Sequence, residues 1–461
     1  MKKLHTLAAA VMALGLASPS AMANKTFTLY DHVSFYDGYL VDNIPADAPD
    51  QGVTRLYTFL NTVKISDEVL DQLGSQLSLD VTIHAVCDNY DRIGNVNLAL
   101  VPKGETYTVK YDETDPARIE IARFITPFMD KNKKPDSVPY HYDMDYISSI
   151  LRDKSLREKY DFWIEFEVFG VPYVANEQIS GCAGCNEVFQ GTMTFTTDDI
   201  PAGPVETNVL VPITIRTGDY RNDHGLNNYN EACTDEIGRC IKTWSFDVPE
   251  DLTDARLVLI MSNHGANAGG EEYIRRRHFV SLDDERIANF KPGGVSCEPF
   301  RKYNTQLNGI YGTSVRDDNS WILSSNWCPG SAITTRLFEL EALGKGTHTV
   351  TIEVPQATFK DKQGYFPTSI FLQGATDGKL APEGAIESIE AELTSQVQVL
   401  QGSIVVTSDV PVKLIQLFNV DGTMAAYRFG NTIPTNEIRS GVYLLGVTLE
   451  NGMREMHKLA I

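Results

Sequence analysis

Three short acidic stretches contain the residue types that hydrolytic chemistry requires. They are CDNYDRIGN (87–95), WIEFEVFG (163–170) and GGEEYIRRRHF (269–279). A carboxylate within hydrogen-bond reach of a water molecule can orient the water and remove its proton, and a second carboxyl group can protonate a leaving group. The carboxylates that these stretches offer for such work are Asp91, the pair Glu165 and Glu167, and the pair Glu271 and Glu272.

The first stretch lies within residues 84–98, which we expect to form a single strand because apolar and β-prone residues lie on both sides of it. Alternation along that strand would place Cys87, Asn89 and Asp91 on one face. Taken by itself, the neighbouring pair Asp91–Arg92 is more typical of a solvated sheet face than of a site, because exposed ion pairs contribute little.

The second stretch combines carboxylates with aromatic residues. On a strand, Glu165 and Glu167 share one face with Trp163 and Phe169. Aromatic rings beside carboxylates suit a sugar or peptide ligand, because the rings stack on apolar faces and exclude water. The same pattern is at least as typical of a half-exposed strand that binds nothing.

The third stretch places Glu271 and Glu272 between a Gly-rich loop and Arg275–Arg277. On the surface, such a cluster would have little net effect on stability. In a cleft, the arginines could keep a carboxylate ionised and bind a carbonyl oxygen. His264 and His278 invite a metal-site interpretation, but the sequence contains no His-x-His or HExxH motif, so we expect no metal.

The elements that must position these residues are β-strands. Short alternating segments such as LDVTIHAVC, NVLVPITIRT and THTVTIEVP are separated by Gly, Pro, Asn and Asp clusters, a pattern that predicts β-sandwiches or jelly rolls. The best helix candidate is 146–160. Linker-like stretches at 196–207 and 374–388 divide the chain. The expected parts are a signal peptide (1–23), two β domains (24–197 and 206–375) and a small tail domain (389–461).

Composition limits the classes of partner. The 461 residues are too many for one ordinary core, and 42% hydrophobic residues indicate a globular protein. Forty basic residues against 61 acidic ones give a net charge of −21, which repels phosphate backbones and anionic lipid. We therefore expect no nucleic-acid partner, whereas a glycan or peptide ligand remains compatible with this charge.

The N-terminus predicts export. Lys2 and Lys3 precede the apolar stretch LAAAVMALGLA, and a small-residue cleavage site follows at Ala21–Ala23, which is typical of a secretory signal peptide. No later stretch is long and apolar enough to cross a bilayer. We expect the mature protein to be secreted or held at the cell surface after export through the periplasm.

Seven cysteines in an exported chain favour disulfides. Cys87 is interpreted as a free, buried strand cysteine, and the sequence does not identify a disulfide partner for it. Cys182 and Cys185 form the only CxxC motif, so a zinc site is not expected. The pairings that spacing proposes are Cys182–Cys185, Cys233–Cys240 and Cys297–Cys328.

The tail resembles the C-terminal sorting domains of the type IX secretion system of Bacteroidetes. The resemblance rests on several alternating strands, an NVDG turn, and the ending SGVYLLGV…HKLAI. The alternative is an ordinary small β-sandwich that binds carbohydrate or a neighbouring domain. The strictly C-terminal position, together with a signal peptide for the first export step, favours sorting by the type IX machinery.

Six segments together resemble the peptide-N-glycosidase F family of amidases, which remove whole N-linked glycans from asparagine. RFITP (123–127) and WCPG (327–330) are the most specific, and CDNYDRIGNV, WIEFEVFG, NVLVPITI and GGEEYIRRRHF match in the family order. The resemblance implies an all-β fold of two adjacent jelly-roll domains, here followed by a small C-terminal β-sandwich. It also implies an active site at the interface of the two jelly rolls.

Position by position, the resemblance implies catalytic roles for three carboxylates. Asp91 would engage the first sugar and polarise the linkage, Glu272 would position water, and Glu167 would support the site. Which of Asp91 and Glu272 is the base stays open. Arg92 would fix the carboxylate charge, and Cys297 and Cys328 fall on the disulfide of the family. The substrate-binding positions are Arg92 and, where the family has tryptophan, Tyr90, Phe169 and His264.

The resemblance implies a monomeric hydrolase that acts on N-glycosylated proteins or glycopeptides and requires no cofactor. Three alternatives remain. A secreted homologue could bind glycans without cleaving them, and a structural surface protein would carry the acidic residues incidentally. A copper monooxygenase has a similar paired jelly-roll architecture, but it needs clustered His and a Met ligand, which the sequence does not suggest.

Overall fold

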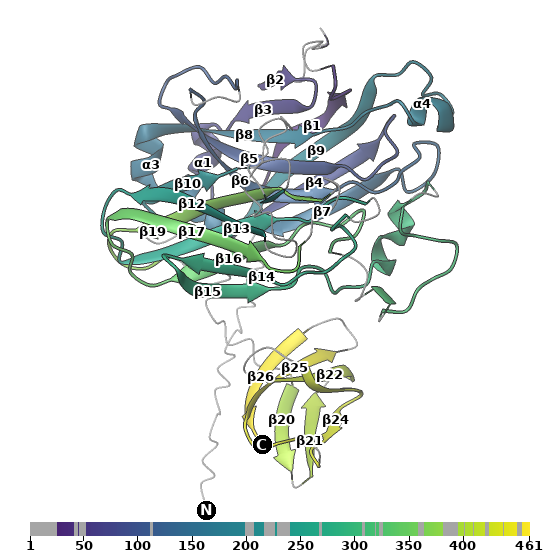
Figure 1. Cartoon of the computed structure of the whole chain (residues 1–461), viewed down its shortest axis with the longest axis vertical. Helices are drawn as coiled ribbons and strands as arrows, with labels where there is room; N and C mark the ends of the chain where they lie inside the picture. Colours follow the sequence, from purple (N-terminus) through teal and green to yellow (C-terminus); the bar gives the residue numbers. More distant parts are fainter. Residues whose placement is uncertain are drawn as a thin grey trace, which may run out of the picture. The chain divides into compact units, whose positions relative to one another are not determined.

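The chain forms two compact units, residues 1–383 and 384–461. The computed structural model describes residues 25–40, 45, 52–110, 114–198, 207–215, 226–227, 240–266, 270–306, 309–318, 320–321, 326–357, 364–380, 395–400, 402–408, 410–419, 424–436, 438–449 and 454–461. The expected signal peptide (1–23) and most of both linkers lie outside these residues. Within them, strands greatly outnumber helices (Figure 1).

The first sandwich of the larger unit packs a four-stranded sheet on a five-stranded sheet. The four-stranded sheet has the order β1 (Lys25–Tyr36), β9 (Glu187–Thr197), β4 (Leu77–Ala85), β7 (Ser137–Asp143). The five-stranded sheet has the order β2 (Val53–Tyr57), β3 (Leu60–Lys64), β8 (Tyr160–Val168), β5 (Ile93–Pro102), β6 (Ala117–Ile125).

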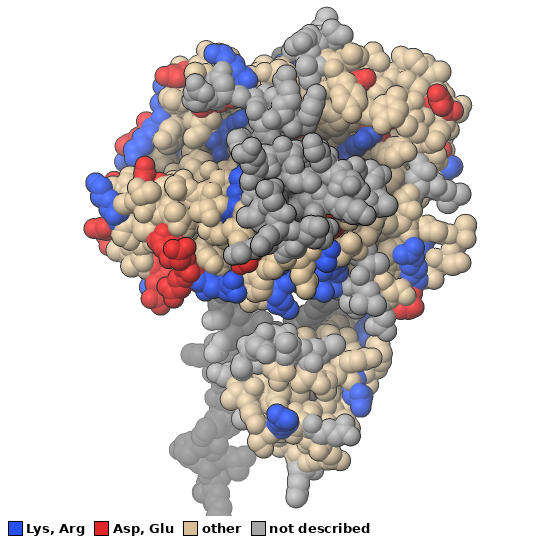
Figure 2. Space-filling view, in the orientation of Figure 1, with Lys and Arg blue, Asp and Glu red and all other residues tan. Residues whose placement is uncertain are grey.

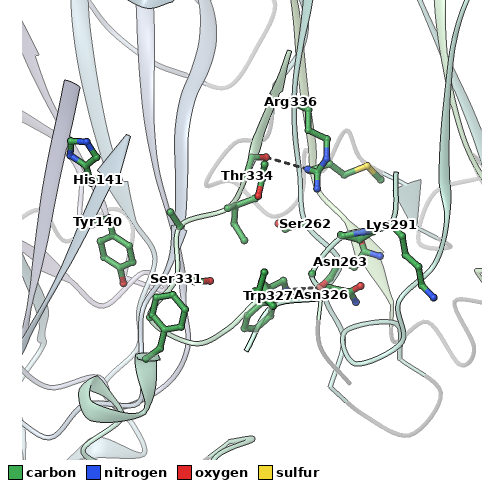
Figure 3. Close-up of a pocket in the computed structure, with 18 of the residues that line it drawn as sticks. Tyr140, His141, Ser262, Asn263, Lys291, Asn326, Trp327, Ser331, Thr334 and Arg336 are labelled. Atoms are coloured by element: carbon green, nitrogen blue, oxygen red, sulfur yellow. Dashed lines mark hydrogen bonds between the residues drawn. The ribbon is translucent and has the colours of Figure 1, made fainter. Parts of the chain in front are cut away.

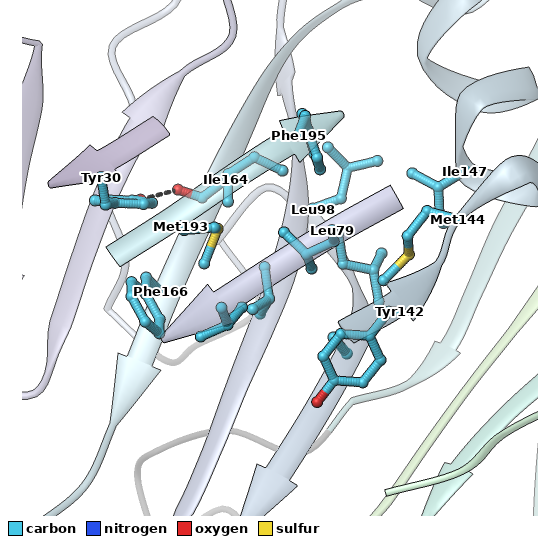
Figure 4. Close-up of a cluster of buried hydrophobic side chains, with 14 of the residues drawn as sticks. Tyr30, Leu79, Leu98, Tyr142, Met144, Ile147, Ile164, Phe166, Met193 and Phe195 are labelled. Carbon is cyan, nitrogen blue, oxygen red and sulfur yellow. Dashed lines mark hydrogen bonds between the residues drawn. The ribbon is translucent and has the colours of Figure 1, made fainter. Parts of the chain in front are cut away.

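Period-2 alternation builds the core between these sheets. In β4 the residues at every second position from Leu77 to Ile83 are buried, as alternation requires when one face packs on a core. Side chains such as Leu79, Leu98 and Phe166 come from both sheets and point toward one another (Figure 4).

The second sandwich has two four-stranded sheets and its own core. One sheet contains β10 (Val209–Thr214), β19 (Thr368–Ala375), β13 (Asp254–Met261) and β16 (Thr335–Leu340). The other contains β12 (Cys240–Val248), β17 (Gly346–Val354), β14 (His278–Leu282) and β15 (Glu285–Phe290). A short pair joins β11 (Leu226–Asn227) to β18 (Tyr365–Phe366). A 3-10 helix, η2, spans Glu298–Tyr303.

The two sandwiches share a tight seam. Strands β13 and β19 are buried on both faces, because one face packs on their own core and the other on the first sandwich. Val258 and Phe371, one from each strand, accordingly belong to the core of the first sandwich. At the same seam the buried guanidinium of Arg123 on β6 bonds Glu120, Ser262 Oγ and the Pro367 carbonyl oxygen.

The helix expected over 146–160 is two helices instead of one. α2 spans Asp145–Arg152 and α3 spans Lys154–Lys159. The break lies at Asp153, which has extended backbone geometry and whose Oδ1 accepts a hydrogen bond from Leu156 N at 2.8 Å. An N-cap of this kind starts a new helix and so ends the previous one. Two further helices, α1 (Asp67–Leu70) and α4 (Ala175–Gln178), are single turns.

The smaller unit is a β-sandwich around a core that includes Ile404, Ile415 and Leu445. One sheet contains β20 (Ser395–Leu400), β21 (Ser403–Ser408) and β24 (Thr432–Pro434). The other contains β23 (Met424–Phe429), β22 (Val412–Asn419), β25 (Val442–Leu449) and β26 (Arg454–Ala460).

The described surface carries basic and acidic side chains side by side on the face in view (Figure 2). Among the described residues, no helix is both long enough and apolar enough to span a membrane.

Candidate active site

Asp91 lies in a loop, which corrects the prediction of one strand over 84–98. β4 ends at Ala85 and β5 begins at Ile93, so residues 86–92 connect the two sheets of the first sandwich. The alternation expected for Cys87, Asn89 and Asp91 therefore does not apply. The buried carboxylate of Asp88 shapes the loop, because it accepts hydrogen bonds from Tyr90 N at 2.9 Å and Val171 N at 2.7 Å.

Arg92 pairs with Asp88 and not with Asp91. Its Nε lies 2.7 Å from Asp88 Oδ2 and its Nη2 lies 3.3 Å from Oδ1, a two-point contact that occupies the guanidinium. Arg92 lowers the pKa of Asp91, but burial and the charge of Glu272 raise it by more. The role in fixing the charge of the site thus applies chiefly to Asp88, and Asp91 is left with a weaker cationic partner.

Thr126 of the RFITP motif holds the residues on both sides of Asp91. Its Oγ1 donates to the Tyr90 carbonyl oxygen at 2.9 Å and accepts from Arg92 N at 2.7 Å. Its own N–H donates to the Arg92 carbonyl oxygen at 2.8 Å. The RFITP motif therefore fixes the backbone around the candidate catalytic aspartate.

The WCPG segment runs beside RFITP and joins the sandwiches at this point. Ile125 N donates to the Ser331 carbonyl oxygen, Gly330 N donates to the Ile125 carbonyl oxygen, and Phe124 forms an antiparallel bridge with Ala332. The two most specific motifs of the sequence are therefore direct backbone neighbours, although they lie about 200 residues apart in the chain.

Glu272 comes from the second sandwich, in the loop between β13 and β14. Gly265 N donates to Glu272 Oε2 at 3.1 Å, which orients the carboxylate. Asn326, which directly precedes WCPG, donates through Nδ2 to the carbonyl oxygens of Glu271 and Glu272 at 2.9 and 2.6 Å. Glu271 itself pairs with Arg276 at 2.8 Å, so of the two neighbouring glutamates only Glu272 is left for the site.

Asp91 and Glu272 interact electrostatically across the seam. Burial and the negative charge of Glu272 raise the pKa of Asp91 well above its usual value. Burial also raises the pKa of Glu272, while the Tyr273 hydroxyl and the Gly265 N–H lower it. Two carboxyl groups in unequal surroundings favour a state in which one is protonated and the other ionised.

Tyr273 is a site residue that the sequence analysis did not predict. Burial and its proximity to Glu272 and Asp91 raise the pKa of its hydroxyl. The phenol therefore stays protonated and is able to donate a hydrogen bond to the Glu272 carboxylate. Its place directly after Glu272 in GGEEY was a usable signal, but the chemical interpretation of that stretch rested on its charged residues and histidines.

Glu167 lies on β8 opposite Asn95 of β5 and is 1% exposed. This register places Glu167 at the end of the sheet where the Asp91 loop enters β5. The carboxylate that most raises the pKa of Asp91 is nevertheless Glu272 and not Glu167. Glu165 on the same face lies deeper in the sheet and accepts hydrogen bonds from Asn97 Nδ2 at 2.7 Å and Arg118 Nη1 at 3.1 Å, which indicates a structural role.

Two of the predicted substrate-binding positions are aromatic residues of the first sandwich. Tyr90, the neighbour of Asp91 in the loop, packs on Phe128 with 5.7 Å between ring centroids and lies under the Arg92 guanidinium at 5.2 Å. Phe169 directly follows the strand that carries Glu167, and it contacts the Tyr39 ring edge-on at 5.5 Å.

His264 directly precedes Gly265, the residue that orients Glu272. Its Nε2 lies 2.7 Å from Ser262 Oγ, and its ring lies 5.3 Å from Trp327 and 5.2 Å from Tyr365. These contacts explain a buried histidine without a metal. In the described part of the chain, no group of three or more His, Cys, Asp and Glu residues is arranged to hold a metal ion.

The disulfides differ in part from the expected pairings. Cys87 is bonded to Cys182, so Cys87 is not an unpaired strand cysteine and the CxxC motif does not close on itself. Cys185 is a free thiol. The segment after α4 carries Cys182 and folds back on the Asp91 loop, where the Cys182 sulfur also lies 3.6 Å from the Val86 carbonyl oxygen.

Cys297 and Cys328 are joined, the pairing that the sequence analysis expected. Cys240 is in a disulfide, whereas its expected partner Cys233 lies outside the described residues.

A pair of adjoining jelly rolls that each supply one carboxylate to a coupled pair defines the class of protein. The family model described as peptide-N-glycosidase F, N terminal, matches residues 47–182, and the one described as peptide-N-glycosidase F, C terminal, matches residues 228–373. Together they span more than half of the chain, which belongs to the peptide-N-glycosidase F family.

Solved structures share the fold. PNGF-II, in two crystal forms, is similar with a TM-score of 0.56 at 18% identity, over 77% of this chain and 66% or 65% of PNGF-II. The chain thus spans just under two thirds of the length of PNGF-II. Recombinant peptide:N-glycanase F (PNGase F) is similar with a TM-score of 0.50 at 14% identity, over 78% of this chain and 97% of that one. No curated protein sequence matches. The structural similarities confirm the all-β, paired jelly-roll fold.

Proposed function

We propose that the chain is a peptide-N-glycosidase, an amidase that hydrolyses the bond between asparagine and the first sugar of an N-linked glycan. The observation that carries the proposal is the coupled pair of Asp91 and Glu272, one from each jelly roll, in a chain of this family. Amide hydrolysis needs a base for water and an acid for the leaving nitrogen, and this pair supplies both.

The unequal surroundings of the two carboxyl groups support separate roles for them. Glu272 accepts a hydrogen bond from Gly265 N and has the Tyr273 hydroxyl beside it, so it is the better site for the negative charge. Asp91, whose pKa is raised further, holds the proton. Glu272 takes a proton from water as the oxygen attacks the carbonyl carbon. Asp91 gives its proton to the nitrogen as the carbon–nitrogen bond breaks, which leaves aspartate on the peptide and a glycosylamine.

The test is release of glycans from a denatured N-glycoprotein by the mature protein in heavy-oxygen water. We expect intact glycans in solution and heavy-oxygen aspartate at each former glycosylation site, both measured by mass spectrometry. Asp91→Asn should abolish release without unfolding the protein, whereas Asp377→Asn, an exposed matched control, should leave it unchanged. Glycan binding by the wild type without any release would contradict the proposed enzyme activity and would favour a glycan-binding homologue.

We also propose that residues 1–23 direct export and that residues 389–461 act as a sorting domain for type IX secretion. The support is the signal-peptide pattern and the C-terminal ending of a small β-sandwich. A reporter that carries both segments should reach the surface or medium of a host with this secretion system. A reporter without residues 389–461 should accumulate in the periplasm, and equal secretion of both would refute the proposal.

A further inference from the structure

A cavity lies beside the candidate active site. It has a volume of about 360 Å³ and is lined by β7 residues of the first sandwich and by loops of the second (Figure 3). Neither Asp91 nor Glu272 lines it. Asn326 connects the two places, because it lines the cavity and also donates to the Glu272 carbonyl oxygen at 2.6 Å.

The cavity wall contains two amide atoms that lack a hydrogen-bond partner in the described structure. Asn263 is 1% exposed with Nδ2 unpaired, and Asn326 is 6% exposed with Oδ1 unpaired. A buried donor and a buried acceptor left unpaired cost the fold free energy, and a ligand in the adjoining cavity that reached them would recover it. Together they offer one donor and one acceptor, which suits a hydroxyl or acetamido group.

The cavity is cationic in a protein of net charge −21. Lys291 and Arg336 line it, and of the described lining residues none carries a carboxylate. The Arg336 guanidinium donates to the Thr334 carbonyl oxygen at 3.2 Å and lies over the Phe290 ring at 3.9 Å. Burial lowers the pKa of Arg336 to about 10, so the group stays charged at neutral pH. A half-buried arginine with no acidic neighbour among the described residues favours an anionic ligand.

Aromatic residues give the cavity the character of a sugar site. Trp327 and Tyr140 line it together with the polar groups (Figure 3), and so does Phe300. Flat rings beside a few directed polar groups are typical of sites for ring-shaped polar ligands. An acidic peptide side chain would use the cations but would leave the rings and the amides unengaged.

We propose that this cavity is a subsite for a carboxylate-bearing sugar of the substrate glycan, with Arg336 binding the carboxylate, Lys291 adding positive charge to the cavity wall, and Asn263 and Asn326 binding neutral groups of the same ring. The proposal rests on the proposed glycosidase function for its substrate. Binding at the cavity is nevertheless measurable without hydrolysis.

The probe is N-acetylneuraminic acid, compared with its methyl ester, which is the same sugar without the charge. Binding to the mature protein is measured by isothermal titration and saturation-transfer NMR. We expect the acid to bind at least about tenfold more tightly than the ester, a typical contribution of a charge-assisted contact. Arg336→Gln and Lys291→Gln should each remove most of that preference, while the exposed control Lys379→Gln should keep it. Thermal unfolding checks that each variant is folded.

The outcomes separate the two proposals. Equal binding of acid and ester, or a preference that survives both cavity variants, overturns the subsite even if glycan release is observed. Preferential binding of the acid without any glycan release supports the subsite and contradicts the proposed glycosidase function. Tighter binding of N-acetylglutamate than of N-acetylneuraminic acid would assign the cavity to an acidic peptide side chain and so overturn the sugar assignment.

Discussion

At the scale of single residues, the chemistry depends on which cation serves which carboxylate. Asp88 takes the two-point contact of Arg92, and this leaves Asp91 next to a second carboxylate with only a weaker cationic influence. The local sequence DNYDR offers Arg92 either aspartate as a partner. The turn at residues 86–92 decides the choice, because it places Asp88 beside both Arg92 and Val171 N.

The pH dependence of glycan release should be bell-shaped. Release requires ionised Glu272 and protonated Asp91, so kcat/KM should fall at low pH as Glu272 takes a proton and at high pH as Asp91 loses one. Because burial raises both pKa values, both limbs should lie above the ordinary carboxyl range. In Glu272→Gln the rate should fall at least about 100-fold. A profile that stays flat from acid to neutral pH would contradict the assignment.

Asp91 should also reduce the stability of the fold as pH rises. Its pKa is higher in the folded than in the unfolded chain, so its favourable contribution is complete below the unfolded pKa and is lost as pH rises through the folded pKa. Asp91→Asn should therefore increase the free energy of unfolding at neutral pH by about 1.4 kcal/mol for each unit of the raised pKa. Urea unfolding at several pH values measures this. Asp377→Asn should have no such effect.

Asp88→Asn should destabilise the protein by about 3 kcal/mol, because it leaves Arg92 without its buried partner. Release should fall as well, since the loop that carries Asp91 loses its support. The matched control is Asp71→Asn, which removes an exposed ion pair with Arg157 and should cost less than about 1 kcal/mol. Similar losses for both variants would show that the Asp88–Arg92 pair is not special.

At the scale of elements, two loops between well-formed strands hold the site. The Asp91 loop joins the two sheets of the first sandwich and is held by Thr126 on one side and by the Cys87–Cys182 disulfide on the other. The Glu272 loop is held by Gly265 and Asn326. Each loop is therefore fixed by contacts beyond its immediate neighbours, which is how a rigid scaffold orients catalytic side chains.

Cys87→Ser should cost about 2–5 kcal/mol of stability, because a disulfide that closes a loop of this length strongly restricts the unfolded chain. Since Cys87 lies in the same loop as Asp91, glycan release should drop together with the unfolding midpoint. Cys185→Ser replaces the free thiol and is the control, which should change neither quantity. A drop in Cys185→Ser equal to that in Cys87→Ser would contradict the observed pairing.

At the scale of the whole molecule, the larger unit behaves as one body because its two sandwiches share buried groups. Val258 and Phe371 of the second sandwich complete the core of the first, and Arg123 of the first bonds Ser262 and Pro367 of the second. The seam also carries Asp91 and Glu272, so any separation of the sandwiches would part the coupled pair.

The two sandwiches should therefore unfold together. In urea, variants that retain either Trp163 of the first sandwich or Trp244 of the second as the single tryptophan should report the same midpoint by fluorescence. Far-UV circular dichroism of the 24–383 fragment gives a third midpoint, which follows secondary structure and should coincide with the two fluorescence midpoints. Two well-separated midpoints would show that the shared contacts are too weak to couple the sandwiches.

The sequence by itself determined the local features of this protein, namely its strands and its motifs. Period-2 alternation predicts strands wherever one face must be buried, and this is enough to predict the all-β fold. The motif order RFITP, GGEE, WCPG indicates the family, and the family resemblance in turn points to Asp91 and Glu272. Alternation failed at 84–98, because Asp88 and its hydrogen-bond partners turn the chain where composition favours a strand.

Only the tertiary structure decided the pairings. The partner of Cys87, the choice of Arg92 between two aspartates, the addition of Tyr273 and the coupling of Asp91 to Glu272 all depend on how the loops and sandwiches pack. Sequence patterns report on neighbours two to four residues away, whereas the coupled pair forms when the second sandwich packs on β6. Burial in the packed sandwiches raises the pKa of both carboxyl groups, and the local sequence of either loop contains no signal for it.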